Sequence, residues 1–298
     1  MRRGAGAKIM AMPSSPPPHT SLGTWPSRWW AEVSARDFAL AQAGLAAETV
    51  AVLPVAAVEQ HGPHLPMSVD ARLLQGVIDA ALPLLPAELP VLFLPPQNIG
   101  FSVEHQSFAG TLTLSPATLI ALWTELGECV ARAGVRKLLL LNGHGGNVAP
   151  MDIVARELRQ RCGLLVYSSS WFSLPLPDEV NGLFGAEEHR FGIHGGAIET
   201  SMMLHLAPAT VRMEHARDFH STSEDRARRH ALLGNGRSAK MGWAIEDYNV
   251  CGAVGNAAGA TAERGALMVE ASARGLVRLL SEMVALPADT VGRAPEPL

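Results

Sequence analysis

Three side chains able to bind a metal ion lie close together in the segment VEQHGPHLPMSVD, residues 58–70. They are the carboxylates of Glu59 and Asp70 and the imidazole of His61. Borderline divalent ions such as Zn²⁺ and Mn²⁺ bind this mixture of oxygen and nitrogen ligands. The segment therefore predicts part of a metal site, and a neighbouring histidine, His64, is expected to have a structural role.

A second candidate region is the glycine-rich sequence LLLLNGHGGN, residues 138–147, which contains the candidate ligand His144. A lone histidine in a turn is ordinarily a surface residue. Glycines on both sides of it permit positive φ angles and close approach of the backbone to a bound group. The GK[ST] ending of a phosphate-binding loop is absent, so a metal ligand is the favoured interpretation.

The third candidate region is FGIHGGAIETSMMLHLAP, residues 191–208. Two glycines precede an apolar helix, which places Glu199 in its first turn or two. An acid there can simply complement the helix dipole, and His194 can equally be structural. The methionines that follow are expected to pack in the core.

Together, these regions supply five candidate ligands, namely Glu59, His61, Asp70, His144 and Glu199. Five side chains exceed what one catalytic ion with an open position needs, whereas two ions sharing a bridging carboxylate would use them all. Two metals about 3.5 to 4 Å apart polarise a carbonyl and lower the pKa of a bridging water. The predicted chemistry is hydrolysis.

The segments around these residues alternate between strand and helix. Strands are expected at 49–59, 91–96, 110–114, 137–143 and 164–172, and helices at 35–42, 71–85, 115–134 and 147–163. Such alternation predicts an α/β fold with a mainly parallel sheet covered by helices on both faces. Ligands of such sheets bind beyond the carboxyl ends of the strands, where the candidate residues lie.

Composition excludes several classes of protein. The 298 residues are 48% hydrophobic and 17% charged, with a net charge of −4, and no basic stripe indicates nucleic acid. No apolar run is long enough to span a bilayer, and three scattered cysteines are typical of a reducing cytoplasm. We expect a disordered tail at 1–22 and a single α/β domain at 23–298.

The combination VEQHGPHLP, Asp70, NGHGGN and HGGAIETSMML resembles the creatininase (creatinine amidohydrolase) family in order and spacing. The segments at 102–115 and 252–265 resemble it too. The resemblance implies a three-layer α/β sandwich, a homohexamer, and two divalent ions per chain, zinc, manganese or iron. It also implies cleavage of an amide-type C–N bond.

By this resemblance, Glu59, His61, Asp70 and His144 match the family's metal ligands, with Asp70 as the bridge. Creatininase itself has a glutamate where this chain has Gly146. The resemblance is therefore to the NGHGGN members, in which Glu199 is the natural replacement ligand.

Other differences concern the substrate pocket. Trp171 matches one of the tryptophans that shape the creatinine pocket, but Arg190 stands where the other would be, and Ile193 replaces a glutamate. Creatinine is therefore not the expected substrate. Arg190 could bind a carboxylate or phosphate, or form a surface ion pair with Glu187 or Glu188.

The remaining assignments concern catalysis and binding. His194 is the candidate for proton transfer to the leaving nitrogen, and the alternative is that it positions a metal ligand. His105, Gly145 and Gly146 are expected to line the substrate pocket, and Gln60 to have a supporting role.

The prediction is a cytoplasmic amidohydrolase in which a hydroxide bridging two metals attacks an amide, formamide or cyclic amide of a small molecule. One alternative is a peptidase-like maturase of a modified peptide, of the mycofactocin type. Another is a small-molecule binding protein that keeps the fold without turnover.

Overall fold

The computed structural model describes residues 23–42 and 44–292, and the predicted tail at 1–22 lies outside them. The described residues form a four-stranded parallel sheet in the order β2-β1-β3-β4 and a two-stranded antiparallel ribbon of β5 and β6. The strands are β1 (Val50–Val55), β2 (Val91–Phe93), β3 (Lys137–Asn142), β4 (Leu165–Ser170), β5 (Asp218–Phe219) and β6 (Gly255–Asn256).

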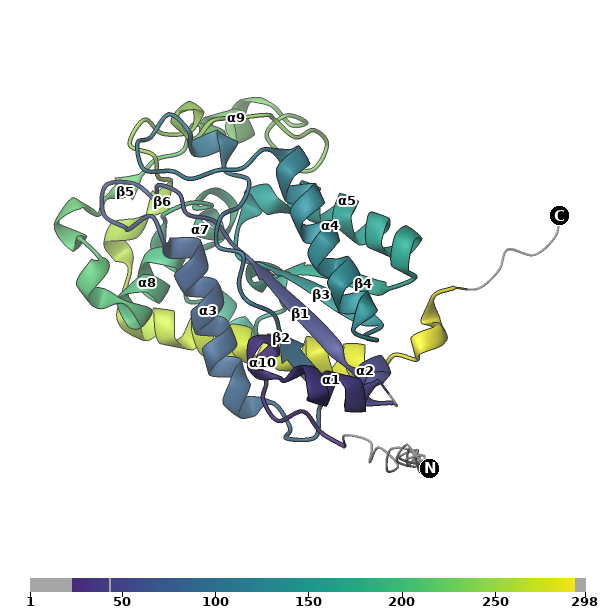
Figure 1. The fold of residues 1–298 in the computed structure, drawn as a ribbon. Coiled ribbons are helices and arrows are strands. Elements are labelled where there is room, and N and C mark those ends of the chain that lie inside the picture. The colour runs from purple at the N-terminus through teal and green to yellow at the C-terminus, as the bar shows by residue number, and fades with distance from the viewer. Residues whose placement is uncertain (1–22, 43, 293–298) are drawn as a thin grey trace, which may run out of the picture.

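Ten α-helices are present in the described part of the chain (Figure 1). They are α1 (Ala35–Ala41), α2 (Leu45–Glu48), α3 (Val69–Ala81), α4 (Pro116–Arg132), α5 (Val148–Cys162), α6 (Asp178–Asn181), α7 (Ala186–Phe191), α8 (Ala197–Leu206), α9 (Thr222–Arg229) and α10 (Ala262–Ala285). Within 23–42 and 44–292, no helix combines the length and apolar character needed to cross a membrane.

The sheet separates two hydrophobic cores. Val50 and Val52 of β1 pack into the core formed with α3, α8 and α10, whereas Ala51 and Leu53 pack into the core formed with α4 and α5. Figure 1 shows α4 and α5 on one side of the sheet and α3 and α10 on the other. Strands buried on both faces have few polar residues, which explains the continuous apolar runs. The predicted three-layer α/β architecture is confirmed.

The four helices with predicted ranges form as α1, α3, α4 and α5, with each end within four residues of its predicted position. α4 begins where predicted, because the Ser115 side chain accepts a hydrogen bond from Thr118 N and Pro116 occupies the first turn. The predicted strand at 110–114 is wrong: Leu112 makes only an isolated bridge with Val58. This segment instead lies on the loops around the sheet, where the Thr111 hydroxyl accepts a hydrogen bond from Gln60 N.

Two helices on one face approach each other unusually closely. A side chain at Gly265 of α10 would place its Cβ 1.9 Å from the Ser201 carbonyl oxygen of α8. The Ser201 hydroxyl also accepts a hydrogen bond from Thr261 N, 3.1 Å away, just before α10. Because α8 carries Glu199, the long helix α10 fixes the position of that carboxylate relative to the sheet.

We expect Gly265→Ala to lower the free energy of unfolding by about 1–3 kcal/mol, because the backbone of α8 must move to admit the methyl group. Alanine's better helix propensity offsets only part of this loss. The matched control is Gly185→Ala, whose added Cβ meets nothing within 4 Å. Urea denaturation followed by circular dichroism measures both variants, and equal stability of Gly265→Ala and wild type would contradict the packing argument.

Candidate metal centre

Four candidate ligands converge beyond the carboxyl ends of β1 and β3. Glu59 and His61 lie on the loop after β1, Asp70 is in the first turn of α3, and His144 follows β3. All four are buried. The parallel neighbours β1 and β3 end side by side, so the sheet itself brings the two loops together.

The Asp70 carboxylate lies between two imidazoles. Its Oδ1 is 3.5 Å from His61 Nε2 and its Oδ2 is 3.5 Å from His144 Nδ1. Glu59 Oε1 is 3.3 Å from His144 Nδ1, and Glu199 Oε2 is 3.8 Å from His61 Nε2. The result is two triads that share Asp70: Glu59, Asp70 and His144, and His61, Asp70 and Glu199.

Each imidazole directs one nitrogen into this cluster. His61 Nδ1 is 3.2 Å from the Glu59 carbonyl oxygen, and His144 Nε2 is 2.8 Å from the Phe101 carbonyl oxygen. A carbonyl oxygen can only accept, so these nitrogens carry the protons. In the neutral imidazole the opposite nitrogen is then free to bind a metal ion, which is the arrangement of histidine ligands held by a backbone carbonyl.

Several buried atoms of the cluster have no hydrogen-bond partner among the described residues. They are both carboxylate oxygens of Glu59, His61 Nε2 and Asp70 Oδ2. Burying ionised groups without compensation is costly, and bound cations remove that cost. The donor set and these unpaired atoms fit divalent metal ions.

The same carboxylates attract protons to the two histidines. Burial lowers the pKa of His144, but the adjacent Glu59 and Asp70 outweigh burial and raise it to about 10. Burial likewise lowers the pKa of His61, and Asp70 and Glu199 raise it to about 9. The cluster thus has a strong preference for positive charge.

The glycine turn after β3 is held by asparagines. Asn142 Oδ1 accepts a hydrogen bond from His144 N at 2.9 Å, while Asn147 Nδ2 donates to the Ala56 carbonyl at 3.0 Å. Gly143, Gly145 and Gly146 are not among the glycines in the left-handed region, so the positive φ angles that glycine permits are not used in this turn. Position 146 requires glycine because the backbone approaches closely there. An added Cβ would lie 2.2 Å from the Phe101 carbonyl oxygen.

Glu199 is placed by a tight turn before α8. Gly195 has φ of +65°, and its N–H donates to Glu199 Oε2 at 2.6 Å. The Glu188 carboxylate accepts hydrogen bonds from Ala197 N and from Asn256 N. Glu188 therefore ties the start of α8 to β6. Burial raises the pKa of Glu199 to about 7, although His61 opposes the shift.

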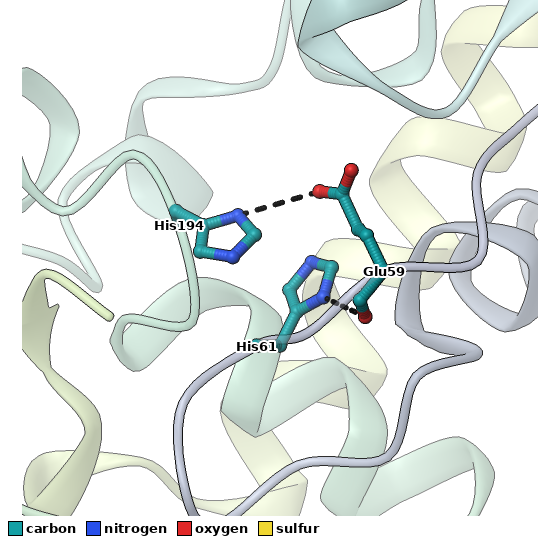
Figure 2. Close-up of side chains that lie close together, drawn as sticks. All are labelled: Glu59, His61 and His194. Atoms are coloured by element: carbon teal, nitrogen blue, oxygen red, sulfur yellow. Dashed lines mark hydrogen bonds and ion pairs between the residues drawn. The ribbon is translucent and has the colours of Figure 1, made fainter. Parts of the chain in front are cut away.

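His194 lies beside His61, with 4.0 Å between the centroids of the two rings. Its Nε2 donates to the Gln60 carbonyl at 2.7 Å, so Nδ1 carries the lone pair, 3.6 Å from Glu59 Oε1. Figure 2 shows the His194 ring and the Glu59 carboxylate pointing toward each other, with His61 beside them. Glu59, His61 and His194 form a third group with ligand geometry. Burial, reinforced by His61, lowers the pKa of His194 well below its usual value.

Gln60 positions a further histidine. Gln60 Oε1 accepts from Gly62 N at 2.8 Å, so its Nε2 is the donor to His105 Nδ1, also at 2.8 Å. The proton of His105 is then on Nε2, 3.3 Å from Glu59 Oε1. His64 is structural, as expected, because its Nε2 contacts the Thr200 hydroxyl at 2.9 Å.

A cavity of about 350 Å³ opens onto the cluster. The predicted residues that line it are Glu59, Asp70, His105, His144, Gly145, Gly146, Trp171, His194 and Glu199. His61 lies behind this surface, fully buried. Arg190 does not line the cavity: it donates to the Gly234 carbonyl at 2.9 Å and lies over the Phe191 ring. The alternative ion pair of Arg190 with Glu187 or Glu188 does not form among the described residues either.

Sequence reasoning missed several residues of the cavity, among them Glu104 and Trp243. Glu104 lies beside the glycine turn, with Oε1 3.5 Å from His144 Nε2, and its position next to His105 could have identified it. Trp243 covers the cavity from a distant loop, with its ring centroid 6.2 Å from that of His105. No local sequence feature distinguishes Trp243 from a core tryptophan.

The model of the family described as creatinine amidohydrolase (Creatininase) matches residues 32–280. The chain belongs to the creatininase family. This creatininase-family chain is 36% identical over 172 residues to the mycofactocin precursor peptide peptidase of Mycobacterium tuberculosis. That match covers 56% of the chain and 62% of the relative, so it spans about three-fifths of that protein.

A creatinine amidohydrolase of Pseudomonas putida is 33% identical over 187 residues, which cover 58% of this chain and 70% of that protein. The fold matches that of a manganese creatininase with a TM-score of 0.68 at 25% identity, covering 87% of this chain and 100% of the other. A creatininase variant described as the Zn-Zn type also gives 0.68 at 25% identity, covering 87% and 99%. Family and fold therefore agree.

We expect Glu199→Gln to bind about one divalent ion where the wild type binds about two, because the triad of His61, Asp70 and Glu199 loses one of its three ligands. Elemental analysis of protein purified without chelator measures the ratio. The matched control is Glu263→Gln, an exposed acid in the first turn of α10. If Glu199 only complements the helix dipole, both variants keep both ions and lose at most about 1 kcal/mol of stability.

Proposed function

We propose that this protein is a binuclear-metal amidohydrolase that cleaves an amide, formamide or cyclic-amide C–N bond of a small molecule. The observation that carries the proposal is the pair of ligand triads sharing Asp70 at the base of the cavity. A shared carboxylate with one oxygen toward each histidine suits two neighbouring ions better than one.

Two divalent ions bound there would polarise the substrate carbonyl and lower the pKa of a water between them. In the proposal, Glu59, Asp70 and His144 hold one ion, and His61, Asp70 and Glu199 hold the other. Zinc and manganese are the leading candidates, because related creatininases are described as manganese and Zn-Zn forms. Iron remains an alternative from the ligand chemistry.

The residues around the cluster would orient the reactants and move a proton. His194 Nδ1 carries a lone pair at the cavity wall, so it can accept a proton from the attacking water. It then donates that proton to the nitrogen of the breaking C–N bond, which leaves as a neutral amine. Gln60 orients the His105 ring, whose Nε2 lies 3.3 Å from Glu59 Oε1 at the edge of the cluster.

The shape of the cavity favours a small substrate. Its volume of about 350 Å³ is at the lower end of the usual range for small-molecule sites, and the side walls include Trp171, Phe172 and Trp243. Aromatic walls suit a planar amide or ring. Gly145 leaves room for the substrate next to His144, because a Cβ added there would meet nothing within 4 Å.

A second candidate function is supported by the mycofactocin precursor peptide peptidase, which is 36% identical over the matched region. In that case the substrate would be a peptide bond of another protein's modified peptide. A screen of small amides, formamides and peptides distinguishes the two, because a peptidase-like maturase turns over only the peptides. A homohexameric assembly and a cytoplasmic location stay predictions.

The first test of the proposal is metal content and dependence. We expect about two divalent ions per chain, loss of amide hydrolysis after chelation, and recovery on adding Mn²⁺ or Zn²⁺. Elemental analysis and an activity assay on the same preparation measure both. Full activity at a ratio clearly below one ion per chain would overturn the two-metal proposal.

The second test concerns creatinine. We expect weak or absent turnover, because Gly146, Ile193 and Arg190 replace residues of creatininase, and Arg190 points away from the cavity. A direct assay of creatine formation, with a creatininase as positive control, measures this. A kcat/KM in the range of about 10⁴ to 10⁸ M⁻¹s⁻¹ that is typical of working enzymes would show that creatinine is a substrate after all.

A further inference from the structure

A second pocket of about 280 Å³ lies next to the catalytic cavity. Two residues, Ile193 and Trp243, line both spaces. The boundary runs along α7 and the residues after it: Glu188 and His189 face the cavity, whereas Arg190 and Phe191 face the second pocket. A substrate that extends past Ile193 and Trp243 would enter this second space.

The second pocket, here called the basic pocket, is lined by three cations: Arg190, Arg226 and Lys240. No carboxylate lines it, and among the described residues none of the three cations forms an ion pair. Other arginines of this chain behave differently, since Arg228 pairs with Glu224 and Arg274 pairs with Glu270. The basic pocket therefore has a positive charge that the described protein does not neutralise.

Aromatic rings connect the basic pocket with the metal cluster. The Trp243 ring lies 6.2 Å from that of His105 and 4.9 Å from that of Tyr248, between centroids. The Arg226 guanidinium lies 5.0 Å from the Tyr248 centroid. Stacking and the hydrogen bond from Arg190 to Gly234 hold both guanidinium groups in place before any ligand binds. Such preorganisation reduces the entropy lost on binding.

We propose that the basic pocket binds an anionic group of the substrate, a carboxylate or phosphate, while the scissile amide lies in the catalytic cavity. The proposal rests on the amidohydrolase function for the reacting end of the substrate, but the anion site itself does not. Planar guanidinium groups bind carboxylates and phosphates through two parallel hydrogen bonds. The Ser223 side chain is a further lining group that can donate a hydrogen bond.

The anion site is tested by binding, without turnover, on the metal-loaded protein. The probes are inorganic phosphate and glutarate, titrated by isothermal calorimetry into wild type, Arg226→Gln and Lys240→Gln. We expect each substitution to weaken binding about tenfold, because each removes a charge-assisted contact. An anion held by the metals binds equally to all three proteins, so the difference reports the basic pocket.

One control variant and the choice of test variants keep this experiment decisive. Arg274→Gln removes an exposed arginine of α10 and should bind both probes as the wild type does. Lys240 makes no hydrogen bond or ion pair among the described residues, so Lys240→Gln is expected to fold even if Arg226→Gln does not. Equal affinity in wild type and Lys240→Gln, or no saturable binding, overturns the proposal. Tighter binding of phosphate or of glutarate identifies which anion the pocket prefers.

Measurements of turnover then test the anion site and the amidohydrolase function separately. Matched pairs of amides, with a terminal carboxylate or the uncharged carboxamide, are compared in wild type and Lys240→Gln. We expect a lower KM for the carboxylate member in wild type only, with kcat unchanged. If no amide is hydrolysed while the anion titrations succeed, the amidohydrolase function fails and the anion site stands. If amides are hydrolysed without preference for charge, the basic pocket is not a substrate site.

Discussion

The Asp70 carboxylate, shared between two buried histidines, is the interaction around which the site is organised. With Glu59 and Glu199 nearby, it concentrates negative charge where little water can reach. Such a cluster is stable only when cations neutralise it, whether protons on the histidines or metal ions. The raised pKa values of His61 and His144 reflect the same requirement, because protonated imidazoles supply positive charge.

The surrounding backbone is arranged to maintain this cluster. Carbonyl groups of Glu59, Gln60 and Phe101 accept hydrogen bonds from the ring N–H groups of three histidines and so decide which nitrogen faces the carboxylates. Asn142 holds the turn that carries His144. The Phe101 carbonyl that binds His144 also requires glycine at position 146, because a larger residue there would collide with it.

The ligand cluster and the rim of the cavity are built by different parts of the fold. The cluster depends on the sheet ends and on the packing of α8 against α10, which tolerate little change. The rim depends on α7 and on the loop that carries Trp243. Altered rim residues can change the substrate without disturbing the ligands, which is consistent with relatives named for creatinine and for a peptide.

The sequence by itself predicted the four strands of the parallel sheet, the start of α4 after Ser115 and the candidate ligands, because these depend on local periodicity and on motifs. It also predicted a strand at 110–114 that does not form. Only the tertiary structure decided that Asp70 lies between His61 and His144 and that Arg190 turns away from the cavity. Trp243 likewise reaches the cavity through a long loop. Orientations of this kind depend on contacts between segments far apart in the chain, which short-range patterns do not encode.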